Sequence, residues 1–167
     1  MINFKYDLVV VGAGNAALCS AISAHENGAR VLVLEKGPKQ KRGGNSFFTD
    51  GAIRFAYNDK NEIRQIIPSI SDEEAEKIEI PTYSQEDYLQ DLMRVTEGKS
   101  DPDLANTLVS QSFQTILWMK KHGIEFELNE NQTFEKDEKR HFWGGLPVKT
   151  SDKGVGLIRK LNERVES

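Results

Sequence analysis

Cysteine is nearly absent from this chain of 167 residues, because Cys19 is the only one. A single cysteine excludes an intramolecular disulfide and a zinc site built from cysteine pairs. The three histidines, His25, His122 and His141, are far apart and lack the spacing of metal ligands. The sequence therefore predicts no metal site. Cys19 lies among alanines and is interpreted as a small packing residue.

Long apolar runs and an excess of positive charge are also missing. The stretch Leu8–Val11 is far too short to span a membrane and lacks the pattern of a signal peptide. With 22 basic and 26 acidic side chains the formal net charge is −4, whereas a general nucleic-acid binder usually has a basic face. We therefore expect a cytoplasmic protein with no membrane span and no nucleic-acid partner.

What is present begins with a strand–helix–strand pattern. Leu8–Val11 is apolar without alternation, which is typical of a strand buried on both faces of a parallel sheet. Apolar residues recur at helical spacing between Asn15 and Asn27, Gly28 is a typical helix stop, and the apolar run Val31–Leu34 follows. This order predicts a βαβ unit and an α/β fold.

The turn between the first strand and the helix has the pattern of a dinucleotide-binding site. Gly12 permits a tight turn, Gly14 lets a pyrophosphate reach the backbone, and Ala17 allows close packing of helix and strand. The start of the helix offers free amide groups to phosphates, and Asn15 either binds a phosphate or caps the helix. Glu35 is placed to bind a ribose diol and disfavours a 2′-phosphate, so NADP is not expected.

A second glycine turn follows soon after Glu35. Arg42 precedes Gly43-Gly44-Asn45-Ser46, and paired glycines let a backbone come close to a flat, bulky ligand. Such a turn also supplies further amide donors. The strand–helix–strand unit alone leaves FAD and NAD as alternatives, so the second turn carries the distinction.

The two turns together resemble the fingerprints of the fumarate reductase and succinate dehydrogenase flavoprotein family. The resemblance rests on Gly14–Cys19 and Arg42–Ser46 and continues in Arg94–Gly98 and Trp118–Phe126, where it points to the tricarballylate dehydrogenase branch. It implies a Rossmann-like FAD-binding domain of the glutathione reductase type. It also implies hydride transfer between the flavin and a small di- or tricarboxylate. FAD is expected to bind non-covalently, because this turn lacks the histidine of the covalent members.

The predicted cofactor-binding residues all lie in or beside the two turns. They are Gly12, Gly14, Asn15, Ala16, Ala17, Glu35, Lys36, Gly43, Gly44, Asn45, Ser46, Thr49, Asp50 and Gly51. Asp50 is as well explained by a surface loop as by a place near the flavin. Arg54 is a candidate for a substrate carboxylate, with a solvated loop arginine as the alternative. No catalytic residue is nominated, because the resemblance places the catalytic segments of the family in later sequence.

The remainder is predicted to be mainly helical. Residues 1–61 hold the βαβ unit and the second turn, residues 62–167 continue as helices, and the whole forms the N-terminal part of an incomplete FAD-binding domain without its capping domain. In the helix after Asp101, the buried stripe is expected to comprise Leu104, Leu108, Ile116 and Leu117. Residues 129–142 are highly charged and are interpreted as an exposed loop, and a last helix is expected after Gly156.

Two other functions stay open at this point. One is a non-catalytic product of a truncated or split gene, which needs a complementing chain or an electron-transfer partner. Because the catalytic segments of the family are expected in later sequence, the chain alone is predicted to bind FAD poorly and not to turn over. The other is an NAD-dependent Rossmann dehydrogenase, which a binding preference for NAD over FAD would indicate.

Overall fold

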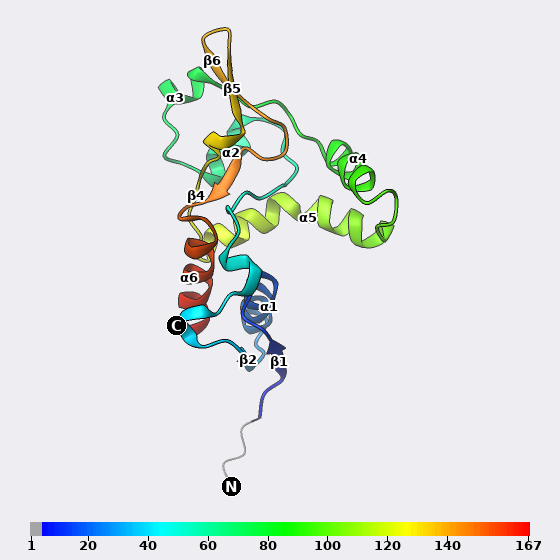
Figure 1. The fold of residues 1–167 in the computed structure, drawn as a ribbon, viewed down its shortest axis with the longest axis vertical. Coiled ribbons are helices and arrows are strands. Elements are labelled where there is room, and N and C mark those ends of the chain that lie inside the picture. The colour runs from blue at the N-terminus through cyan, green and yellow to red at the C-terminus, as the bar shows by residue number, and fades with distance from the viewer. Residues whose placement is uncertain (1–4) are drawn as a thin grey trace. The chain divides into compact units, whose positions relative to one another are not determined.

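The computed structural model describes residues 5–167, which divide into two compact units (Figure 1). Unit 1 comprises the described residues up to Gly51 together with His122–Glu125 and Thr150–Ser167. Unit 2 comprises Ala52–Lys121 and Phe126–Lys149. Each unit is therefore assembled from stretches that are far apart in the sequence. The division into domains after residue 61 stays a prediction.

Unit 1 contains the predicted strand–helix–strand pattern. Its elements are β1 (Leu8–Val11), α1 (Asn15–Glu26) and β2 (Val31–Leu34). The two strands pair in parallel along their whole length. Leu18, Ala21 and Ile22 are the buried side of α1. The α/β fold class is thereby confirmed for this part of the chain.

The last helix completes unit 1. After β2 come two short 3₁₀ turns, η1 (Lys39–Lys41) and η2 (Gly44–Phe47), and α6 (Lys153–Glu166) packs against both α1 and η2. His122 links α1 to α6. Its Nδ1 accepts a hydrogen bond from Arg164 Nε (3.1 Å), and its Nε2 lies 3.0 Å from Glu26 Oε1. The helix α6 begins at Lys153, before the expected start after Gly156.

The strand β1 is more exposed than its sequence predicts. Val9 is 50% exposed and Val11 is 81% exposed, although the run is typical of a strand buried on both faces. In the described part of the chain β1 pairs only with β2. The expectation of burial on both faces is wrong for this chain, because α1 is the element that packs on this two-stranded sheet.

Unit 2 combines helices with short strands. Its helices are α2 (Lys60–Ile66), α3 (Asp72–Lys77), α4 (Gln85–Val95) and α5 (Pro102–Lys121), and a 3₁₀ turn, η3, covers Glu130–Gln132. One sheet has the order β3 (Ile78–Glu79), β6 (Lys139–Phe142), β5 (Thr133–Lys136), and β4 (Phe126–Leu128) pairs with β7 (Val148–Thr150). The capping box of Ser84 and Asp87 begins α4.

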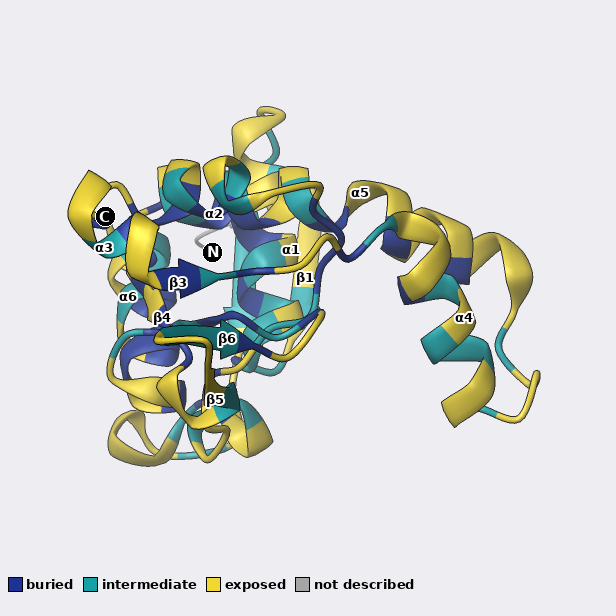
Figure 2. Cartoon of the chain, turned by 90° about the horizontal axis from the view of Figure 1, so that it is seen from above, coloured by how far each residue is buried: buried dark blue, intermediate teal, exposed yellow. Residues whose placement is uncertain are grey.

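Two sequence expectations for unit 2 are wrong. Residues 129–142 contain a β-hairpin instead of a loop, because β5 and β6 pair in antiparallel register on either side of a two-residue turn. Leu104 is 71% exposed and Leu108 is 51% exposed. Ala105 and Val109 are buried in their place, on the side that packs against α4 (Figure 2), whereas Ile116 is buried as predicted.

Within residues 5–167, no helix combines the length and apolar character needed to cross a membrane. The same residues hold no group of three or more histidine, cysteine, aspartate or glutamate side chains placed to bind a metal ion.

Candidate functional site

The first glycine turn joins β1 to α1. Gly12 has φ of +104°, a left-handed conformation that glycine adopts without steric cost, and its N–H donates to the Leu34 carbonyl at 2.6 Å. Gly14 is the N-cap residue of α1 and has no side chain that could accept hydrogen bonds from the amides of the first helical turn. The start of α1 therefore presents backbone donors and the positive end of the helix dipole toward an anion.

Glu35 lies at the end of β2 and holds the first turn in place. Its Oε2 accepts a hydrogen bond from Ala13 N–H at 2.8 Å, and its Oε1 accepts one from Gly37 N–H at 2.6 Å. These bonds, that from Gly37 first, lower the pKa of the Glu35 carboxyl below its ordinary value. Each carboxylate oxygen has a second lone pair, so the group can still bind the hydroxyls of a ribose.

The second glycine turn lies directly over the start of α1. Asn15 N–H donates to Ser46 Oγ at 3.1 Å. A Cβ added to Gly14 would lie 3.5 Å from both Gly43 O and Ser46 Oγ, so the two turns are in van der Waals contact. The structure thus brings together the two sequence patterns that were predicted to bind one cofactor.

The other predicted residues around these turns differ in exposure. Ala16 is exposed on the first turn of α1, and Ala17 is half-buried. Lys36, Gly44 and Asn45 are exposed. A Cβ at Gly44 would meet no other atom within 4 Å, so this glycine borders open space. The open side of the two turns is where a bound ligand has room.

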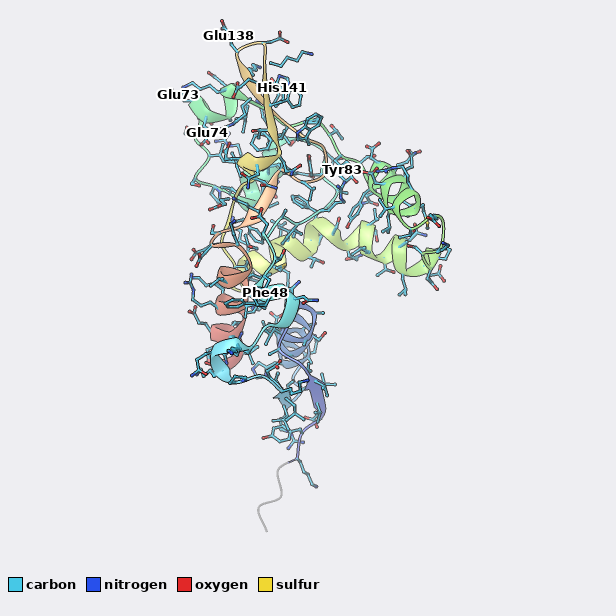
Figure 3. All side chains as sticks on the ribbon, viewed as in Figure 1. Phe48, Glu73, Glu74, Tyr83, Glu138 and His141 are labelled. Atoms are coloured by element: carbon cyan, nitrogen blue, oxygen red, sulfur yellow. The ribbon has the colours of Figure 1, made fainter. Side chains whose placement is uncertain are left out.

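Thr49, Asp50 and Gly51 contact the start of α6. The Thr49 carbonyl accepts a hydrogen bond from Gly154 N–H at 2.9 Å, and Asp50 Oδ1 pairs with Lys153 Nζ at 2.9 Å. A Cβ on Gly51 would overlap Thr150 Oγ1. Their direct role in binding a flavin stays a prediction. Phe48, beside them, is 83% exposed (Figure 3).

A cavity of about 690 Å³ opens in unit 1. Ala13 and Glu35 border it, but its walls are mainly the apolar side chains of α1 and β2 and the end of α6, with Leu18, Ile22 and Val33 among them. This cavity is therefore the open side of the unit 1 core, and the two glycine turns form a separate cradle at its edge.

Arg54 lies in unit 2 and has partners there. Its Nη1 donates to Tyr83 Oη at 2.7 Å and pairs with Asp91 Oδ2 at 3.1 Å, and Tyr83 also donates to Asp91 at 2.9 Å (Figure 3 labels Tyr83). Hydrogen bonds from Arg94 and Tyr83 lower the pKa of Asp91. The charge of Arg54 is thus balanced inside unit 2, which weakens its candidacy for a substrate carboxylate.

Cys19 and His141 have simpler roles. Burial raises the pKa of the Cys19 thiol to about 11, so the thiol is protonated at neutral pH and is a poor nucleophile. His141 lies on β6 and stacks on Phe134 with 5.3 Å between ring centroids (Figure 3). Both observations favour packing over chemistry.

The contribution of α6 to this site was not predicted from the sequence. Ile158 lies against Gly43, where an added Cβ would be 2.8 Å from Ile158 Cγ2. Gly154 lies against Ser46 and Phe47. The pattern Gly154-x-Gly156 at the start of a helix was the signal that could have pointed to a close backbone contact.

Known proteins match most of the chain. A protein family described as an FAD binding domain matches residues 7–146. A fumarate reductase (cytochrome) of Shewanella frigidimarina is 32% identical over 119 residues, which are 71% of this chain and 18% of that protein. An NADH:fumarate oxidoreductase of Klebsiella pneumoniae (strain 342) is 34% identical over 121 residues, 72% of this chain and 11% of that protein.

A solved structure shows a similar fold. The open conformation of a flavocytochrome c3 fumarate reductase superposes with a TM-score of 0.65 at 21% identity, over 96% of this chain and 25% of that one. The chain thus spans about a fifth or less of the length of the two curated proteins above.

Proposed function

The chain belongs to the FAD-binding domain family, and on that premise we propose that it holds FAD for hydride transfer to or from a small di- or tricarboxylate. The family match and the fumarate reductase relatives confirm the predicted family and its cofactor, FAD. The tricarballylate dehydrogenase branch stays a prediction. The NAD-dependent alternative is not favoured, because the matched family binds FAD.

The residues of unit 1 fit FAD, and the contact between the two glycine turns is the observation that carries the proposal. The backbone donors at the start of α1 would hold the pyrophosphate, with Gly14 leaving room for it. Glu35 would bind the ribose of the adenosine half. The open space beside Gly44 would admit the ribityl chain of FAD, which leads to the flavin ring. Ser46 joins this turn to the start of α1.

Bound FAD supplies the redox chemistry, namely the transfer of a hydride at the flavin ring. The contribution of this chain is to bind and orient. Amide donors at the start of α1 would face the phosphates, Glu35 holds the first turn at the end of β2, and Ser46 joins the second turn to α1. A small carboxylate substrate, a cytoplasmic location, and a complementing chain or electron-transfer partner are parts of the same proposal. The names of the fumarate-active relatives support the substrate class.

Equilibrium titration tests the cofactor. We expect the fluorescence of FAD to fall saturably on addition of the chain, with a dissociation constant at least tenfold below that for NAD measured by competition. Glu76, an exposed carboxylate in unit 2, offers a control variant, Glu76→Gln, that leaves the affinity unchanged. Equal or tighter binding of NAD would contradict the proposal.

The substrate class needs a second measurement. The chain is loaded with FAD, reduced under anaerobic conditions and mixed with fumarate or with an unsaturated tricarboxylate. Reoxidation faster than that of free reduced FAD would assign the reaction to this chain. We expect the rate of free FAD, because Arg54 is held by Asp91 and Tyr83. That rate would place the carboxylate-binding groups on a complementing chain.

A further inference from the structure

The first turn of α6 lies against the second glycine turn with no space for a side chain between them. Gly154 N–H donates to the Thr49 carbonyl at 2.9 Å. A Cβ built on Gly154 would overlap the Ser46 carbonyl oxygen and lie 2.7 Å from the Phe47 carbonyl oxygen. These are backbone atoms, which cannot rotate away as the end of a flexible side chain can. The contact therefore exists because residue 154 is glycine (Figure 1 shows α6 beside η2).

Two further contacts hold the ends of the same segment. Gly43, at its beginning, faces Ile158 one helical turn beyond Gly154. Gly51, at its end, faces Thr150, and a Cβ there would also lie 3.1 Å from Lys153 Cα. Residues 43–51 are therefore held at their beginning, middle and end by residues 150–158.

The backbone that leads into α6 is bent to reach this position. Asp152 and Lys153 have φ of +59° and +55°, a left-handed conformation that side chains with a Cβ rarely adopt. Residues of this kind persist where the surrounding structure holds them. The ion pair of Lys153 with Asp50 is one of the contacts that hold them.

We propose that Gly154 is a positioning residue for FAD and that Thr150, Lys153, Gly154 and Ile158, which contact residues 43–51, form a third part of the cofactor site, behind the two glycine turns. This inference rests on the proposed function, the binding of FAD by unit 1. Gly154 acts through Ser46: its contact fixes the Ser46 carbonyl, and Ser46 Oγ in turn accepts from Asn15 N–H at the start of α1. A methyl group at residue 154 displaces the second turn from its place against α6 and so disturbs the hydrogen bond between Ser46 and the start of α1.

The test compares Gly154→Ala with a matched control on the same helix. In Gly156→Ala the added methyl overlaps Ser151 O and lies 2.9 Å from Asp152 Cβ, which both precede α6, and none of its nearest atoms belongs to the second glycine turn. We expect FAD to bind Gly154→Ala at least tenfold more weakly than the unmodified chain. Gly156→Ala is expected to lower the unfolding temperature while its folded fraction keeps the affinity for FAD.

Amide exchange of the FAD-free chain separates positioning from general destabilisation. Gly154→Ala is expected to raise exchange in residues 43–50 and at Asn15, whose amide donates to Ser46 Oγ, and to leave the rest of α1 and all of β2 unchanged. A uniform rise across unit 1, or an equal loss of FAD affinity in Gly156→Ala, would overturn the inference. If the unmodified chain does not quench FAD fluorescence, the proposed function fails, and the exchange pattern alone then decides whether Gly154 positions the turn.

A second variant covers the case in which Gly154→Ala does not fold. Lys153→Ala removes the ion pair with Asp50 and adds no atom to the contact. We expect a two- to fivefold loss of FAD affinity with unchanged far-UV circular dichroism. Wild-type affinity in Lys153→Ala would then overturn the inference.

Discussion

The Glu35 carboxylate has one observed role and one proposed role. Its oxygens accept hydrogen bonds from Ala13 and Gly37, and under the proposed function the same group binds the ribose of FAD. The sequence predicted the proposed role from the spacing of the acid after the glycine turn. The observed role depends on the path of the backbone after β2, which no residue type in that segment specifies.

Replacing Glu35 by glutamine should weaken FAD binding. The amide has one acceptor oxygen, so it keeps a bond to either Ala13 or Gly37 and loses the charge that strengthens bonds to ribose hydroxyls. Because hydrogen bonds to a charged group are stronger than those to a neutral one, we expect a loss of affinity of roughly tenfold or more. Fluorescence titration measures it, with Glu76→Gln as the control. An unchanged affinity would show that Glu35 does not contact the cofactor.

Acid titration measures what Glu35 contributes to the stability of the folded chain. Because its pKa is lowered in the folded chain, its stabilising contribution is complete above the ordinary pKa of a glutamate and is lost as the pH falls through the lower folded value. The unmodified chain should therefore lose more stability than Glu35→Gln as the pH falls below about 4. Urea unfolding at a series of pH values measures this, and parallel curves for the two proteins would contradict it.

Cys19 should be chemically inert in the folded chain. With its pKa raised to about 11 by burial, the thiolate is scarce at pH 8. We expect alkylation by iodoacetamide to be much slower in the folded chain than in urea, and Cys19→Ala to bind FAD with unchanged affinity. Rapid labelling of the native chain at pH 8 would contradict this.

Elements that begin and end with strong local signals were predictable. The capping box at Ser84 begins α4, and Asp101 accepts from the amides of Asp103 and Leu104 at the start of α5. The β5–β6 hairpin was missed because its strands are rich in charge and its turn, Asp137-Glu138, lacks glycine. The buried face of α5 was also misjudged, since apolar spacing does not say which side meets α4.

The turn of that hairpin offers a stabilising substitution. Asp137 and Glu138 have φ of +52° and +61°, as a type I′ turn requires, at a steric cost that Asn-Gly avoids. We expect Asp137→Asn with Glu138→Gly to add about 1 kcal/mol of stability and raise the unfolding temperature by roughly 2–4 °C. Glu76→Gly, inside α3, should instead cost about 1 kcal/mol. Calorimetry distinguishes the two, and a lower temperature for the hairpin variant would contradict the prediction.

At the scale of the whole chain, only part of the site could be predicted from the sequence. Both glycine turns were predictable, because each combines a glycine pattern with its neighbouring elements over a few residues. The contact of Gly154 with Ser46 was not, because it joins residues more than a hundred positions apart and carries no local pattern beyond two glycines. The exposure of Val11 is likewise a property of which elements surround β1.

FAD should protect one unit and not the other. All contacts assigned to the cofactor lie in unit 1, so binding should slow amide exchange in residues 12–17, 35–37 and 43–51 and leave residues 133–142 of unit 2 unchanged. At a hundredfold excess of FAD over its dissociation constant the stabilisation is about 2.7 kcal/mol. Exchange with mass spectrometry measures this, and protection confined to the β5–β6 hairpin would contradict the assignment.

Because unit 1 is built from separate stretches of the sequence, the order of synthesis on the ribosome matters for it. Residues up to Gly51 emerge first, but α6 closes unit 1 only after residues 52–149 have been made. At about 5–20 residues per second the first strands, α1 and both glycine turns wait roughly 5–20 seconds for the helix that holds them. Through that interval the nascent chain carries a nucleotide cradle without its support. Under the proposed function, stable capture of FAD therefore follows the synthesis of α6.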